Sequence, residues 1–64
     1  MRVEIFFIDE LMSHSHKYKA SKDAIYHFNK VTNAINKKLR IVTLVDGTQR
    51  ATYKTSTIKA VILK

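Results

Sequence analysis

The chain has 64 residues, with 12 Lys and Arg against five Asp and Glu, a net charge of +7, and no Cys. This length fits a single domain, residues 1–64, which buries only about 60% of its unfolded surface, and the absence of cysteine excludes disulfides and thiolate metal sites. The apolar runs are far shorter than the roughly 20 residues of a membrane-spanning helix, and no signal-peptide pattern is visible, so we expect a cytoplasmic protein without membrane contact.

The first predicted element is a strand over residues 2–8. β-Branched and aromatic residues alternate there, as is typical of a strand. One face has the apolar residues Val3, Ile5 and Phe7. The other face begins polar and becomes apolar at Phe6 and Ile8, which indicates either cover by another element or a second subunit, or a central strand buried on both faces.

The second predicted element is a helix. Residues 9–20 have no regular pattern and are interpreted as a loop. Ser21 is expected to cap the helix, Asp23 lies in the first turn where the helix dipole favours a negative charge, and the pattern continues to about Lys38. The expected core-facing stripe consists of Ala24, Ile25, Phe28, Val31, Thr32, Ile35 and Leu39.

A β-hairpin is predicted next, from runs over residues 40–45 and 48–54. Asp46 and Gly47 between them favour a two-residue type I′ turn, since both central positions of that turn need positive φ. The facing pairs would then be Val45 and Thr48, Thr43 and Arg50, Val42 and Ala51, and Ile41 and Thr52. The inward face would have Val42, Leu44, Ala51 and Tyr53.

The chain closes with a predicted turn at residues 55–57 and a strand over 58–63. The element order is therefore β-α-β-β-β, an α+β fold in which one amphipathic helix packs on a four-stranded, largely antiparallel sheet. Residues 40–64 are similar in pattern to the meanders of SH3-like and Sm-like proteins, with Asp-Gly-Thr and Thr-Ser-Thr separating three strands. This resemblance assigns no site residue.

The positive charge is concentrated after the first ten residues. Residues 1–10 sum to −2, with Arg2 against three acids, whereas residues 11–64 sum to +9, with eleven basic residues against two acids. Such a field attracts phosphate-rich or acidic partners.

The helix side opposite the predicted core is the main candidate surface. It combines lysines that can neutralise phosphates, amides that can reach a base edge and a tyrosine that can stack on a base. An ordinary solvated helix face has a similar composition, but the absence of acids favours a binding surface. Its residues are Lys22, Tyr26, Asn29, Lys30, Asn33 and Lys37.

Four further cations, Lys38, Arg40, Arg50 and Lys54, are candidate phosphate contacts at the helix end and on the hairpin. Threonine-rich strand faces are also what solvent normally covers. We therefore predict a non-enzymatic module that binds nucleic acid, either DNA or RNA, as expected of a small regulatory or phage or mobile-element protein.

Two other functions stay open. The first is an inhibitor or accessory subunit that docks on an acidic protein surface through strand edges and the apolar residues Phe6, Ile8, Val61 and Leu63. The second is a homo-oligomer built by edge pairing.

Histidines offer a weaker alternative. His14 and His16 can point to one side of an extended segment, with His27 as a third ligand and Asp9 or Glu10 as a fourth, but such loop histidines without cysteine are common by chance. No nucleophile, paired carboxylates or phosphate loop supports catalysis. We expect no enzyme activity, no metal and no cofactor.

Overall fold

The computed structural model describes residues 1–64 as one helix and five strands in two sheets. The elements are β1 (Arg2–Phe7), β2 (His14–Lys17), α1 (Ser21–Asn36), β3 (Ile41–Asp46), β4 (Gln49–Lys54), the 3₁₀ turn η1 (Thr55–Thr57) and β5 (Ile58–Leu63). One sheet has the order β2-β1-β5, the other is the β3-β4 hairpin, and all pairs are antiparallel. The α+β class is confirmed, but two sheets replace the single four-stranded sheet that was expected.

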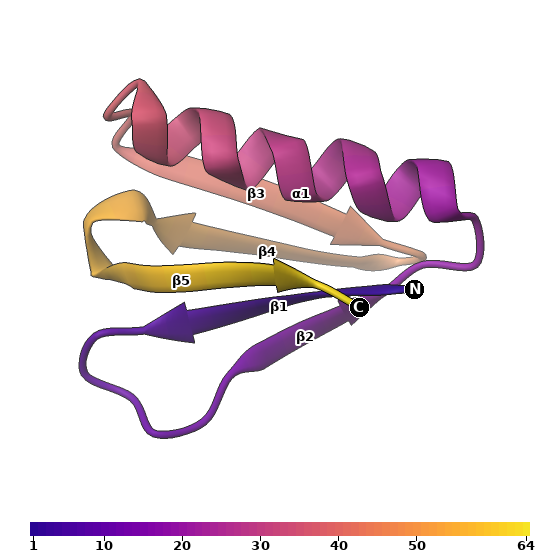
Figure 1. The fold of residues 1–64 in the computed structure, drawn as a ribbon, viewed down its shortest axis with the longest axis horizontal. Helices are drawn as coiled ribbons and strands as arrows, with labels where there is room; N and C mark the ends of the chain where they lie inside the picture. The colour runs from indigo at the N-terminus through magenta and orange to yellow at the C-terminus, as the bar shows by residue number, and fades with distance from the viewer.

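Helix α1 covers one side of the strands. It contacts β5, β3, β1 and η1, and in Figure 1 it runs across the top of the molecule with β1 and β2 at the opposite side. The core between these layers consists of Val3, Ile5, Phe7, Ala24, Val31, Ala34, Val42, Leu44 and Ile58. No helix has the length and apolar composition that crossing a membrane requires.

Strand β2 lies where a loop was predicted. It pairs with β1 so that His16 is opposite Val3 and His14 is opposite Ile5. The pattern concealed this strand because its one buried position holds the imidazole of His16 instead of an aliphatic side chain. This pairing makes β1 the central strand of its sheet, which agrees with the interpretation of residues 2–8 as a central strand. Ile8, just beyond β1, nevertheless remains 62% exposed.

The helix differs from its prediction at both ends. Ala20 is the N-cap and no side chain caps the first turn, so the predicted cap by Ser21 is wrong. The helix ends at Asn36 instead of Lys38, because Lys38 adopts a left-handed φ of 56°. The amide of Leu39 then reaches the Ala34 carbonyl at 2.9 Å, a bonding pattern that terminates helices.

The buried side of α1 is rotated from the predicted stripe. Ala24 and Ala34 are fully buried, whereas Ile25 is 43% and Ile35 is 37% exposed. Small alanine side chains let the helix approach the strands closely on their side, and the larger isoleucines remain at the margin. The centre of the contact between α1 and the strands therefore lies at the alanines and not at the larger isoleucines of the predicted stripe.

The hairpin forms with a shifted register. Its turn is Gly47 and Thr48, so Val45 faces Arg50 instead of Thr48. Gly47 has a φ of 60° and no other hairpin residue has positive φ, which excludes the predicted type I′ turn. The shift equals two residues, so each side chain keeps its predicted face, and Val42 and Leu44 are buried as expected.

Candidate nucleic-acid interface

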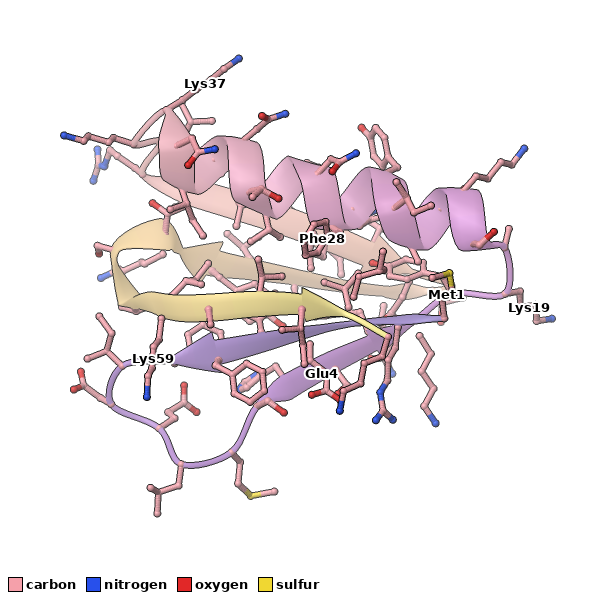
Figure 2. The ribbon with its side chains drawn as sticks, in the orientation of Figure 1. Met1, Glu4, Lys19, Phe28, Lys37 and Lys59 are labelled. Carbon is pink, nitrogen blue, oxygen red and sulfur yellow. The ribbon has the colours of Figure 1, made fainter.

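The outer side of α1 is a continuous exposed surface, which we name the outer helix face. Figure 2 shows side chains along the helix that project away from the sheets, with Lys37 near the C-terminal end. All six predicted residues are exposed, and Tyr26 is 62% exposed. A shallow hollow is lined by five of them, namely Tyr26, Asn29, Lys30, Asn33 and Lys37.

Acids do not neutralise this face. Among the 12 Lys and Arg residues, only Arg2 and Lys64 form ion pairs, both with Glu4, which leaves ten without a carboxylate partner. The other ion-pair contacts join His14 to Glu10 and His16 to Asp46. The positive charge of the helix therefore faces solvent and is available to an anionic partner.

The other predicted cations divide into two places. Lys38, Arg40 and Lys54 meet beyond the C-terminus of α1, because β4 brings Lys54 opposite Ile41. Arg50 is instead opposite Val45 at the far end of the hairpin, about 13 Å away along β4 at the usual rise per residue. The structure thus gathers three of these four cations.

These three cations border a depression that we name the helix-end groove. It has a volume of about 490 Å³ and is lined by Ile35, Lys38, Leu39, Arg40, Ile41, Lys54, Thr55 and Ser56. Sequence reasoning identified the cations but assigned Ile35 and Leu39 to the core. The termination of the helix at Asn36 was the missing information, since it turns Leu39 and the start of β3 toward this groove.

His16 belongs to a buried polar network instead of a metal cluster. Its Nδ1 donates to Asp46 Oδ2 at 2.7 Å, and its Nε2 lies 2.6 Å from the Tyr53 hydroxyl. His16 is only 6% exposed, and the network joins β2 of one sheet to the hairpin of the other. Nothing in the chain's periodicity indicated this contact between distant segments.

The three histidines do not converge. His27 stacks on Tyr18 with a centroid distance of 4.6 Å and contacts Tyr26 edge-on. No group of three or more His, Asp or Glu side chains lies close enough together to hold a metal ion. The interpretation of His27 as a third ligand beside His14 and His16 is therefore wrong.

Two tyrosine hydroxyls near this network are hard to ionise. Burial, followed by the nearby Asp46 carboxylate, raises the pKa of Tyr18 from 10.0 to about 12. The same two causes raise the pKa of Tyr53. The Tyr53 hydroxyl has His16 as its partner, whereas the buried Tyr18 hydroxyl has none.

Most apolar residues of the alternative protein-docking surface are partly covered. Phe6, Val61 and Leu63 are half-buried in the three-stranded sheet. The two most exposed large apolar residues of the chain lie instead in the loop after β1, where Leu11 is 104% and Met12 is 79% exposed. The apolar docking surface of this alternative function would therefore be centred on this loop.

No model of a known protein family matches the chain, and no curated protein has a similar sequence. The class that the structure defines is a small α+β domain with one acid-poor, strongly basic helix side.

Proposed function

We propose that this protein is a non-enzymatic module that binds DNA or RNA through the outer helix face. The observation that carries the proposal is that exposed lysines, amides and a tyrosine share this face without an ion-paired acid. Lysines attract phosphates, amides form hydrogen bonds with base edges or phosphates, and tyrosine stacks on bases. The face thus provides each type of contact that nucleic acid requires.

The spacing of the lysines supports contact with a backbone. Lys22, Lys30 and Lys37 follow one side of the helix, and the 15 residue-to-residue steps from Lys22 to Lys37 correspond to about 22 Å of helix length. Several phosphates of one nucleic-acid strand lie within that length. The folded helix therefore already holds these lysines in a row, so its backbone does not have to become ordered when the lysines bind a row of phosphates.

The choice of cation favours phosphate contact over base reading. Nine of the 12 basic residues are lysines, and a lysine ammonium is a point charge without the planar fork by which arginine recognises guanine. We therefore expect binding that depends strongly on salt and weakly on sequence.

The experiment is a salt titration of fluorescence anisotropy with a labelled 20-mer. The Lys30→Glu/Lys37→Glu variant removes two phosphate contacts and is expected to bind about 30-fold more weakly at 0.15 M salt, with a salt slope reduced by about 2. The matched control is Lys19→Glu/Lys59→Glu, which changes the net charge equally. Lys19 and Lys59 are exposed and unpaired, and Figure 2 shows them at other parts of the molecule.

The control should retain most of the affinity. An equal loss of affinity in both variants would show that binding depends only on net charge, and it would contradict binding through the outer helix face. Wild-type binding that does not change between low and physiological salt would contradict nucleic-acid binding itself.

A second candidate function rests on the loop of Ile8, Leu11 and Met12. Three exposed apolar side chains this close in sequence are a feature of protein-docking surfaces. In this alternative, the protein is an inhibitor or accessory subunit whose basic surface steers it to an acidic partner. A partner retained after nuclease treatment, and lost in Leu11→Ser/Met12→Ser but not in Lys30→Glu/Lys37→Glu, would favour it.

A further inference from the structure

The helix-end groove has an apolar floor that the core does not use. Ile35, Leu39 and Ile41 line it and are 37%, 50% and 56% exposed. They come from the last helical turn, the connection and the first residue of β3. Each such side chain loses contact with water when an apolar group covers it, which favours a ligand with an apolar surface.

The margin of the groove is cationic. Lys38, Arg40 and Lys54 line it together with Thr55 and Ser56, and no Asp or Glu does. The Thr55 amide donates to the Arg40 carbonyl at 3.1 Å, which holds the two sides of the groove together. Three unpaired cations beside an apolar floor are complementary to a ligand that carries both an anion and an apolar face.

Lys38 occupies a costly backbone position. Its φ of 56° is in the left-handed region, at the helix end where glycine is the usual residue because it has no Cβ. A lysine at this position contributes its ammonium to the groove at the expense of backbone strain. Strained backbone positions of this kind are concentrated at binding sites.

We propose that the helix-end groove receives one unpaired nucleotide of a single-stranded nucleic acid, a specialisation that rests on the proposed function. The base would lie on Ile35, Leu39 and Ile41, and the adjacent phosphates would meet the cationic margin. A duplex cannot occupy the groove in this way because its bases are stacked inside the helix. The volume of about 490 Å³ is in the range of small-ligand sites.

An acidic peptide is the competing occupant. It would match the cations, but aspartate and glutamate side chains have little apolar surface for the floor. A nucleotide joins a flat, largely apolar base to a phosphate within one unit, so one ligand satisfies both parts of the groove. The charge and the apolar floor together favour the nucleotide.

The test measures anisotropy with a labelled 12-nucleotide oligothymidine, an oligouridine of the same length, a 12-base-pair duplex and a labelled oligoglutamate. Lys38→Gly is expected to raise the melting temperature, because it relieves the positive φ, and to weaken single-strand binding about fivefold. Ile41→Ala is expected to weaken single-strand binding about fivefold and to leave duplex binding unchanged. The matched control Val45→Ala trims another exposed aliphatic residue on the same face of β3 and should change neither.

Four results would overturn the groove proposal. The first is that Lys38→Gly and Ile41→Ala bind single strands with unchanged affinity, and the second is that they lose affinity equally for the duplex and for the single strands. The third is that Val45→Ala loses as much single-strand affinity as Ile41→Ala. The fourth is that the wild-type protein binds an oligoglutamate more tightly than either single strand. If the groove variants bind normally but Lys30→Glu/Lys37→Glu loses affinity for nucleic acid, the proposed function stands and only the groove proposal is rejected. If the wild-type protein binds no nucleic acid at all, both proposals fail.

Discussion

The buried ionisable side chains of the three-stranded sheet are paired, whereas the lysines of the outer helix face are unpaired and exposed. In the sheet, the buried Glu4 lies 2.9 Å from Arg2 and 3.6 Å from Lys64, and His16 is bonded to Asp46 and Tyr53. On the helix face, the lysines have no carboxylate partner. The ionic interactions that stabilise the fold are thus separate from the charges that face solvent.

This difference indicates which charges are structural. When a buried polar group loses its hydrogen-bond partner, the free energy of unfolding falls, whereas an exposed lysine contributes little to stability. Substitutions in the two regions should therefore act on different properties, namely stability in the sheet and affinity on the helix.

The largest effect is expected for His16→Ala. The substitution leaves the Asp46 carboxylate and the Tyr53 hydroxyl partly buried without their partner, so we expect the free energy of unfolding to fall by about 2 to 4 kcal/mol. Urea denaturation followed by circular dichroism measures it. If this loss unfolds so small a domain, Tyr53→Phe removes one of the two bonds and should cost about 1 kcal/mol.

The control is His14→Ala. His14 is on the same strand but exposed, and its contact with Glu10 at 3.2 Å is at the surface, so the expected loss is below about 1 kcal/mol. Equal losses for the two histidines would contradict a special role for the His16 network.

An intermediate effect is expected for Glu4→Gln, compared with Lys30→Gln. Glu4 is buried and has two cationic partners, so neutralising it should cost about 1 kcal/mol. Lys30 is exposed and unpaired, so its neutralisation should change stability by less than about 0.5 kcal/mol. The unfolding midpoints of the two variants at equal ionic strength test the comparison, and the reverse order would contradict it.

The smallest effect at neutral pH is expected for Tyr18→Phe, since the buried Tyr18 hydroxyl has no partner to lose. Alkaline pH should reveal its role. Because the pKa of Tyr18 is raised from 10.0 to about 12, its contribution to stability is complete below pH 10 and is lost as the pH rises toward 12. Tyr18→Phe should therefore lose less stability than wild type between these pH values.

Unfolding midpoints at pH 7 and pH 11 measure this difference. Tyr53, whose pKa is also raised, keeps some alkaline sensitivity in the variant. A variant that is destabilised at pH 7 and has wild-type sensitivity at pH 11 would show that the hydroxyl has a partner in solution.

Local patterns predicted some elements well and others poorly. Strand β1 and the hairpin faces follow from the alternation of Val3 with Ile5 and of Val42 with Leu44, because burial of one strand face imposes a period of about two. The helix follows from the seven-residue spacing of Ala24 and Val31, which is about two turns at a period of about 3.6. Strand β2 escaped detection because His16 replaces an aliphatic residue at its inward position, and its partner Asp46 is 30 residues away in the sequence.

The outer helix face was also recognisable from sequence, since its six polar residues recur with the period of a helix and are all exposed. The helix-end groove was not recognisable, although its cations were. It required the helix to end at Asn36 and Lys54 to lie opposite Ile41. Both are consequences of backbone geometry that residue types do not specify.

The sequence by itself determined the α+β class, the amphipathic helix and the excess of positive charge, because periodicity and composition are local properties of a chain. Only the tertiary structure decided that the strands form two sheets, that His16 joins them and that Lys38, Arg40 and Lys54 meet around an apolar floor. These features arise from contacts between segments far apart in sequence. Such contacts depend on how the helix and strands pack, and no local pattern encodes that packing.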